Sequence, residues 1–451
     1  MWIRGDPGKG KTMLISGIIE ELEKSEVSLA YFYCEAMQAA QSTDTAVLRG
    51  LIYMLVRQKP MLISHVREVY DIKGEKAFEG LNARVSLQRI LTNMIKDANS
   101  HGTILVVDAL DECTAKDEQH VAQIIVSLSN LVGHAKWIVS SRNWPEIERY
   151  LHNAENADTI HLELNRNSVS KAVLSYIQQK VRDLPPDYNS TLRTTVENYL
   201  IANADNTFLW VALVIKRLAI LPAHRGQKEL YSFPPGLDAL YQRMLEQILG
   251  SDEVDCLLQI LVTVMIAFRP LKTAELGNLV ESVEGYDESS IQDAVLSCGS
   301  FLTLQGDKVY PLHQSATDFL FLRQNNIFTS GVMSHHHRVF SVSVKCLKRK
   351  LKRDMSKTSC SDLEYLCHYW HRHILFTEDE DALDPVRPDV ETLATLLDFL
   401  KTKLLHWLEA GRYSCSDFPW QFNNIEAIAC LENKLVSRLL SPINKSPIPH
   451  G

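Results

Sequence analysis

A glycine-rich octapeptide near the N-terminus constrains this chain more than any other feature. It reads Gly-Asp-Pro-Gly-Lys-Gly-Lys-Thr over residues 5–12 and matches the pattern G-x-x-x-x-G-K-[ST] at every defined position. Glycines let such a loop wrap so that successive N–H groups point at phosphate oxygens, and a following helix adds the positive end of its dipole. The sequence therefore predicts a phosphate-binding loop (P-loop) that opens a helix.

The octapeptide also assigns roles to particular side chains. Lys11 is expected to reach the β- and γ-phosphates of a nucleotide, and Thr12 to hold Mg²⁺ through its hydroxyl. The expected nucleotide-binding set is Gly5, Asp6, Pro7, Gly8, Lys9, Gly10, Lys11, Thr12 and Met13. The alternative is a glycine-rich turn without a ligand. The strand-like fragment before the loop and the amphipathic helix after it argue against that alternative.

A second acidic motif follows about a hundred residues later. Residues 104–113 read ILVVDALDEC, in which four apolar residues predict a buried strand and Asp108 stands at its C-terminal end. P-loop proteins place a magnesium carboxylate there. Asp111 and Glu112 follow within one turn and are expected to polarise the attacking water or to steady the metal. The alternative is that they form an acidic helix-capping cluster.

Arg142 ends the next predicted strand, after Ser140 and Ser141. Ligands collect at the C-terminal ends of parallel strands, so Arg142 faces the same crevice. We expect it to sense the γ-phosphate, with a surface arginine that closes the strand as the alternative. The candidate catalytic residues are therefore Asp111, Glu112 and Arg142, and the candidate metal ligands are Thr12 and Asp108.

Strand and helix patterns alternate up to about residue 165, which predicts an α/β P-loop NTPase domain with a parallel sheet covered by helices on both faces. The expected strands are 28–34, 103–108, 136–141 and 159–164, and the expected helices after the first are 44–70, 85–98, 117–132 and 145–151. Only residues 2–4 remain for the first strand. Because a central strand usually has five or six residues, we expect a truncated start with residues missing upstream.

Beyond residue 165 the pattern becomes all-α. Helical periodicity covers 168–184, 190–220, 235–249, 254–268 and 272–283. A hairpin-like segment at 301–313, with a turn at Gly306 and Asp307, interrupts the helices. Helices flanking a small hairpin indicate a winged helix. Further helices are expected near 390–410 and 424–440.

Composition excludes several functional classes. The net charge of −8 argues against nucleic-acid binding, which usually needs a basic face. Nine cysteines lie singly, with no CxxC pair, and indicate free thiols in a reducing, cytoplasmic setting. The longest apolar stretch, Leu257–Phe268, is too short to span a membrane. We therefore expect no nucleic-acid partner and no integral membrane segment.

The motifs together resemble the NACHT branch of the STAND signalling NTPases, and in particular the fungal NACHT proteins of the heterokaryon-incompatibility type. The resemblance rests on six strings in family order between residues 2 and about 320. These are WIRGDPGKGKTML, ILVVDALDEC, WIVSSRNWPEIE, NTFLWVALV, FPPGLDALYQRML and VYPLHQSATDFL. The family fold has a five-stranded sheet with an extra strand between the P-loop strand and the Walker B strand, and the strand at 28–34 fits that slot.

The resemblance implies a domain order, here with expected boundaries. These are a NACHT domain at 1–165, a helical domain at 166–250, a winged helix at 251–330, a helical extension at 331–375, an acidic linker at 376–390, and C-terminal helices with a tail at 391–451. It also implies that His313 contacts the β-phosphate of a bound diphosphate, with a buried histidine bonded to backbone as the alternative. The chain lacks the proline that many relatives place near the adenine, at the start of 205–210, so ATP and GTP both stay open.

Three functions follow from these observations. The first is a regulatory NTPase switch that binds ATP or GTP with Mg²⁺ and hydrolyses it slowly, in intracellular signalling or self/non-self recognition. Its further partners would be copies of itself or other signalling proteins. The second is an interaction scaffold with a vestigial nucleotide site, and the third is a metabolic P-loop phosphotransferase. Relatives usually carry an N-terminal effector domain and C-terminal repeats. Neither is visible here, so we expect a fragment, a degraded gene product or an adaptor.

Overall fold

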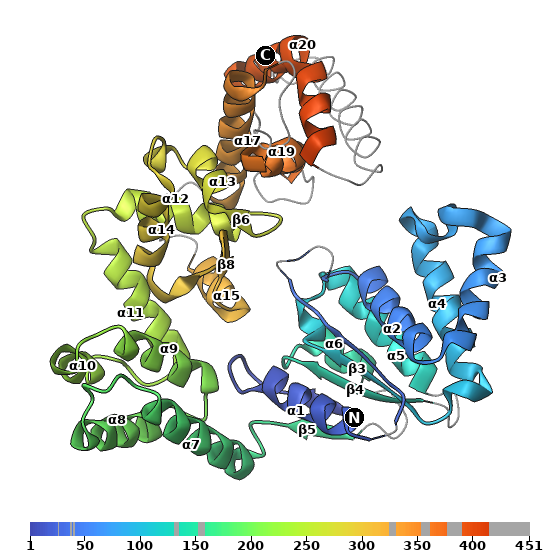
Figure 1. Ribbon diagram of the computed structural model, residues 1–451, viewed down its shortest axis with the longest axis horizontal. Helices are drawn as coiled ribbons and strands as arrows, with labels where there is room; N and C mark the ends of the chain where they lie inside the picture. Colours follow the sequence, from blue (N-terminus) through green and yellow to red (C-terminus); the bar gives the residue numbers. More distant parts are fainter. Residues whose placement is uncertain are drawn as a thin grey trace, which may run out of the picture. The chain divides into compact units, whose positions relative to one another are not determined.

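The computed structural model describes residues 1–25, 27–36, 38, 41–129, 135–151, 158–323, 331–352, 361–376 and 390–414. It divides into two compact units, Met1–Arg243 and Met244–Gly451. Figure 1 shows the elements of both units, coloured along the sequence. The expected acidic linker at 376–390, the expected helix at 424–440 and the C-terminal tail lie almost wholly outside the described residues.

Unit 1 is built on a five-stranded parallel sheet in the order β2-β3-β4-β1-β5. The strands are β1 (Trp2–Arg4), β2 (Leu29–Tyr33), β3 (Thr103–Asp108), β4 (Ala135–Ser141) and β5 (Thr159–His161). The helices around them are α1 (Lys11–Glu23), α2 (Asp44–Gln58), α3 (Ile63–Lys73), α4 (Gly80–Lys96), α5 (Ala115–Ser129) and α6 (Pro145–Leu151). The predicted fold class, a P-loop-type parallel sheet followed by mostly helical structure, is confirmed.

Alternate residues of the strands show that helices cover both faces of this sheet. Leu105 and Val107 of β3 join a core cluster with apolar residues of α2, α4 and α5. Val106 between them is also fully buried but lies outside that cluster, because successive side chains of a strand point to opposite faces. The opposite face is the one on which α1 packs, through buried Ile15 and Ile19.

The position of the second strand differs from the sequence-based expectation. The strand between the P-loop strand and the Walker B strand is β4, whereas β2 is an edge strand that pairs only with β3 among the described strands. The expectation that residues 28–34 fill that slot was wrong. Order along the chain does not fix order across a parallel sheet, because a crossover helix can carry the chain past a neighbour.

The first strand is short, as predicted, yet it lies inside the sheet. All three residues of β1 are paired with β4 on one side and with β5 on the other. Met1 extends this pairing, since its carbonyl accepts a hydrogen bond from Val139 N and its amino group donates to Trp137 O over 2.8 Å. Ile3 is fully buried, so this strand anchors the loop that follows it.

The remainder of unit 1 is helical. Its helices are α7 (Arg166–Arg182), α8 (Ser190–Asn203), α9 (Phe208–Ala219) and α10 (Ala223–Leu230), with α11 (Leu237–Leu249) running across the division between the units. The expected single helix at 190–220 is two helices, separated at Asp205 and Asn206. Both residues have positive φ, 44° and 55°, which ends α8 and redirects the chain.

Unit 2 combines helices with a small antiparallel sheet in the order β6-β8-β7. The strands are β6 (Leu271–Lys272), β7 (Leu302–Gln305) and β8 (Lys308–Pro311). The helices are α12 (Val254–Met265), α13 (Thr273–Leu279), α14 (Glu288–Ser297), α15 (Gln314–Leu322), α17 (Gly331–Lys350), α19 (Glu364–Phe376) and α20 (Val390–Ser414). The predicted hairpin is present, and β6 adds a third strand that the sequence did not reveal.

None of the described helices is long and apolar enough to cross a membrane.

Candidate functional site

The glycine-rich loop joins the end of β1 to the start of α1. Gly8 and Gly10 adopt left-handed backbone conformations, with φ of 76° and 86°, which other residues adopt only with strain. Gly10 is the residue before α1, and its carbonyl accepts a hydrogen bond from Leu14 N over 2.9 Å. The local sequence therefore produces a tight turn whose following helix begins at Lys11.

Residues from the helical part of unit 1 pack directly on this loop. A Cβ added at Gly8 would meet Thr207 and Leu209 at 2.9 Å, and one added at Gly10 would meet the Phe208 ring at 2.8 Å. Lys9 Nζ donates to the Asp205 carbonyl over 2.6 Å and to Thr207 Oγ1 over 3.2 Å. We call residues 205–209 the loop clamp. Sequence reasoning located this segment near the base but missed its contacts with the loop glycines.

Lys11 lies within the electrostatic field of the predicted acidic site. Its Nζ donates to the Gly5 carbonyl over 2.6 Å and to the Asp6 carbonyl over 3.2 Å. Burial lowers the pKa of Lys11, which Asp111 and Asp108 partly oppose and Arg142 reinforces. The loop lysine, the two predicted carboxylates and the predicted sensor arginine therefore interact in one region of unit 1.

Asp108 ends β3 and is buried with its carboxylate bound by two hydroxyls. Ser140 Oγ donates to Asp108 Oδ1, and a second hydrogen bond comes from Thr12. Burial raises the pKa of Asp108, and these two hydrogen bonds oppose the rise. A carboxylate and a threonine hydroxyl side by side are hard oxygen donors of the kind that Mg²⁺ prefers. The chemistry of this donor pair fits a magnesium ion held by Thr12 and Asp108.

Asp111 and Arg142 are bound to each other. Arg142 Nε lies 2.9 Å from Asp111 Oδ2, and the Arg142 backbone N–H donates to Asp111 Oδ1 over 3.0 Å. Both side chains are nearly buried, with exposures of 12% for Arg142 and 3% for Asp111. Removing one partner of such a pair leaves a buried charge uncompensated. The structure thus joins two predicted catalytic residues in one ion pair beside Asp108.

Glu112 has the environment of a group that titrates near neutrality. Burial, reinforced by Asp111, raises its pKa from 4.5 to about 7, while a hydrogen bond from Ala36 N to Glu112 Oε2 opposes the rise. Glu118 of α5 behaves in the same way, with burial and then Asp111 raising its pKa to about 7. Sequence reasoning missed Glu118. Its place on one helical face, inside an otherwise apolar pattern, was the available signal.

Two further polar residues near the loop were missed. Glu163 Oε1 accepts the Asp6 N–H over 2.5 Å, and Asn143 Nδ2 donates to Asp6 Oδ1 over 3.1 Å. Both follow the C-terminal ends of strands, at the sheet edge where ligands of parallel sheets collect. That position was the signal by which they could have been found.

A cavity of about 650 Å³ opens beside the loop, within unit 1. Its wall includes Met13 and Leu14 of α1, which are 52% and 40% exposed despite being apolar. Phe208 and Tyr176 contribute aromatic rings that meet edge to face, with centroids 5.5 Å apart. Asn165 and Gln179 are among the polar groups on the wall. An apolar cavity with a few polar groups next to a phosphate loop suits a flat organic group joined to phosphates.

His313 lies in unit 2, immediately before α15. Its Nδ1 accepts a hydrogen bond from Ser315 N over 3.0 Å and lies 2.8 Å from Ser315 Oγ. His313 therefore caps the N-terminus of α15. This contact belongs to unit 2 alone, and the predicted role at a β-phosphate stays a prediction.

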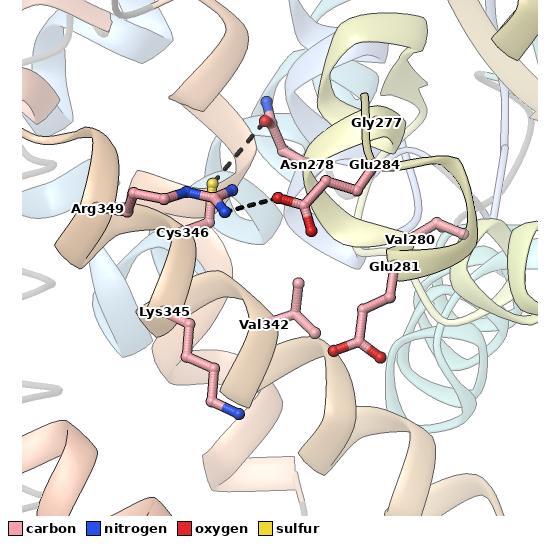
Figure 2. Close-up of a pocket in the computed structure, with 9 residues that line it drawn as sticks. All are labelled: Gly277, Asn278, Val280, Glu281, Glu284, Val342, Lys345, Cys346 and Arg349. Atoms are coloured by element: carbon pink, nitrogen blue, oxygen red, sulfur yellow. Dashed lines mark hydrogen bonds and ion pairs between the residues drawn. The ribbon is translucent and has the colours of Figure 1, made fainter. Parts of the chain in front are cut away.

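A smaller cavity of about 140 Å³ lies in unit 2 between α13 and α17 (Figure 2). Arg349 pairs there with Glu284 over 2.6 Å, and Cys346 Sγ contacts Asn278 Oδ1 over 3.8 Å (Figure 2). The Cys346–Asn278 contact joins α17 to α13, and the Arg349–Glu284 pair joins α17 to the segment that follows α13. Among the described residues, no group of three or more potential metal-ligating side chains could hold a metal ion.

Comparisons with known proteins agree with the motifs. Residues 1–142 match the family described as Nephrocystin 3, N-terminal. The chain is 38% identical over 447 aligned residues to the vegetative incompatibility protein HET-E-1 of Podospora anserina. This alignment covers 91% of the present chain and 33% of the relative, so the chain spans about a third of that relative's length.

Solved structures give weaker likenesses. A Walker-type ATPase of Pyrococcus abyssi is 11% identical with a TM-score of 0.33, covering 71% of this chain and 90% of that one. The ORC1 protein of Aeropyrum pernix, solved in complex with DNA, is 13% identical with a TM-score of 0.32, covering 73% and 87%. At these scores the fold assignment rests on the strand order and on the loop after β1. The chain is thus similar over most of its length to a fungal NACHT-type incompatibility protein, which confirms the resemblance predicted from its motifs.

Proposed function

We propose that unit 1 binds a nucleoside triphosphate with Mg²⁺ and that the chain acts as a NACHT-type regulatory switch with slow hydrolysis. One observation carries the proposal. The loop glycines, Lys11 and the Thr12–Asp108 pair lie together, and the 650 Å³ cavity opens beside the same loop. Phosphates would lie along the loop N–H groups, and the base and ribose would enter the cavity. By analogy with the incompatibility protein that it resembles, the chain would act in a signalling process of the same kind.

Hydrolysis would fall to the acidic segment after β3. Glu112, with a pKa near 7, has the protonation balance that general-base catalysis at neutral pH requires. When a γ-phosphate is present, Arg142 would leave Asp111 and bind the phosphate. Without a γ-phosphate, the Asp111–Arg142 ion pair would stay intact. Thr12 and Asp108 would hold Mg²⁺, which supplies charge neutralisation between the phosphates when bound.

The domain boundaries extend this proposal to the remainder of the chain. We take residues 166–250 as the helical domain and residues 251–330 as a winged helix, supported by the β6-β8-β7 sheet beside α12, α13 and α14. His313 would then report the diphosphate state to unit 2. That role rests on the family resemblance alone.

The test is isothermal calorimetry of the full chain with ATP and with GTP, each with and without Mg²⁺. Lys11→Ala should weaken binding about 10- to 100-fold, because a hydrogen bond to a charged group contributes about 1.5–3 kcal/mol. Lys24→Ala is the matched control. It removes a lysine at the end of the same helix that is 67% exposed and pairs with Glu21. Equal affinities for wild type and Lys11→Ala would refute nucleotide binding at this loop.

A further inference from the structure

Two cysteines that are far apart in the sequence contact each other, and one of them directly follows the acidic segment Asp111–Glu112. Cys34 directly follows β2, and Cys113 directly follows the short 3-10 helix η4 (Leu110–Glu112). The Cys113 thiol donates a hydrogen bond to Cys34 Sγ over 3.4 Å, although 79 positions separate the two residues. Both are free thiols, and both are buried, with exposures of 5% and 6%.

The backbone holds both cysteines where they are. Cys34 N donates to the Asp108 carbonyl over 3.0 Å, which continues the ladder between β2 and β3 by one residue. Cys113 N donates to the Leu110 carbonyl over 3.1 Å and closes the turn of η4. These main-chain hydrogen bonds at the edge of the sheet therefore fix the short distance between the two sulfur atoms.

We propose that Cys34 and Cys113 form a reversible disulfide that ties the end of β2 to the segment carrying Asp111 and Glu112. A disulfide bond is about 2.0 Å long, so the sulfur atoms need to approach by about 1.4 Å from their present separation. The two side chains, or the short segments that carry them, have to supply this movement. The modification site stands independently of the proposed function, whereas its effect on hydrolysis rests on it.

The chemistry needs a two-electron oxidant, for which a hydroperoxide is sufficient. One thiolate attacks the peroxide oxygen, becomes a sulfenic acid and releases water from hydrogen peroxide. The second thiol then attacks that sulfur, the S–S bond forms, and the hydroxyl leaves as a second water. The two cysteines lose two protons and two electrons in total, and the peroxide is reduced to two molecules of water.

Either cysteine can supply the thiolate of the first step, and the other then resolves the sulfenic acid. The hydrogen bond with Cys113, burial, and the nearby Asp108 and Glu112 carboxylates raise the pKa of Cys34. Since the thiolate is the reactive form, this raised pKa slows the reaction of Cys34 with the oxidant. Burial means that local opening precedes the first step, so the reaction should be slow compared with that of an exposed thiol.

The bond would change the acidic segment because Glu112 and Cys113 are consecutive residues. Glu112 Oε2 accepts a hydrogen bond from Ala36 N, two residues after Cys34, over 3.3 Å. Drawing the two cysteines together would therefore move both ends of this contact. We expect the oxidised form to hydrolyse nucleotide more slowly than the reduced form.

The experiment uses the full chain, purified in dithiothreitol, exchanged into buffer and treated with hydrogen peroxide. Remaining thiols are alkylated and the unreduced digest is mapped by mass spectrometry. We expect a linked peptide pair containing Cys34 and Cys113, two hydrogens lighter than the separate peptides and absent after dithiothreitol. The melting temperature of oxidised wild type should also rise, because the bond closes a long loop in the unfolded chain.

Variants separate this bond from other oxidation. Cys34→Ser and Cys113→Ser should both abolish the linked peptide and the rise in melting temperature. Cys346→Ser is the matched control, because it removes a buried thiol of unit 2 that contacts Asn278 and Arg349. If Cys34 and Cys113 are still free thiols after peroxide, and so become alkylated, or if they link to other cysteines, the proposal is wrong. The peptide map of the wild-type chain alone decides this.

The turnover measurement then addresses regulation. Oxidised wild type should lose at least half of its hydrolysis rate, and oxidised Cys113→Ser should not. A mapped disulfide with unchanged turnover would overturn the regulatory effect. A mapped disulfide in a chain that binds no nucleotide in either redox form would overturn the proposed function and leave the modification site standing.

Discussion

Replacing Gly10 with alanine tests whether the loop and the loop clamp are fitted to each other. A φ of 86° costs an L-amino acid about 1–2 kcal/mol. The added Cβ would also lie 2.8 Å from two atoms of the Phe208 ring, so the ring or the loop has to move. Together these effects should lower the free energy of unfolding by about 2–3 kcal/mol.

The size of the unit converts this cost into a measurable shift. For a domain of about 150–250 residues, 1 kcal/mol corresponds to about 2–4 °C, so the melting temperature should fall by about 4–12 °C. Nucleotide affinity should fall about tenfold, because the N–H groups of a displaced loop no longer converge on one phosphate position. Scanning calorimetry measures the first effect and isothermal titration the second.

Two controls isolate the cause. Gly17→Ala adds the same methyl group within α1, where no atom lies within 4 Å, and should stabilise the helix by about 0.5–1 kcal/mol. In a Phe208→Ala background, Gly10→Ala should cost only its backbone strain of about 1–2 kcal/mol. An unchanged melting temperature for Gly10→Ala, or the same cost in both backgrounds, would refute the fit between the loop and the clamp.

Three further predictions concern ionisable groups. Asp108→Asn should weaken Mg²⁺-dependent nucleotide binding at least tenfold in titrations, whereas Asp111→Asn and Glu112→Gln should keep binding and slow hydrolysis. If all three variants hydrolysed nucleotide at the wild-type rate, these carboxylates would have a structural role. Burial raises the pKa of Glu118 to about 7, so between pH 4.5 and 7 the folded state binds more protons than the unfolded state, and stability falls as pH rises. Glu118→Gln should flatten that part of the pH profile and raise the melting temperature at pH 8, and an unchanged profile would contradict the assignment. His313→Ala should lower the free energy of unfolding by about 1 kcal/mol because it removes the helix cap, whereas His313→Asn should keep the cap. Both variants should weaken diphosphate affinity more than triphosphate affinity in paired titrations. An unchanged affinity ratio would show that His313 only caps the helix.

The sequence predicted the local elements of unit 1 well because their signals are local. The apolar run at 103–108 became β3 with the expected bounds, and the helix at 145–151 likewise became α6. The helix at 190–220 was predicted as one, because the break at Asp205 and Asn206 depends on two positive φ angles rather than on proline or glycine. Periodicity reports the burial of a face and is insensitive to such a break.

The order of strands and the pairing of side chains were beyond the reach of the sequence. The placement of residues 28–34 was wrong because a parallel sheet can be crossed in several orders by the same helices. Asp111 and Arg142 were each assigned to the crevice, but their ion pair follows only from the register of β3 and β4. The contact between Cys34 and Cys113 depends on the same long-range geometry, between β2 and β3.

The loop clamp also has a kinetic consequence. Gly8 and Gly10 lie against Thr207, Phe208 and Leu209, so the loop cannot change conformation until those side chains withdraw. If a nucleotide occupies the loop, its residence time is then limited by a local opening of α9 and not by the strength of the phosphate contacts alone. Substitutions at Thr207 and Leu209, which contact Gly8 but do not line the 650 Å³ cavity, would accordingly change the dissociation rate of the ligand.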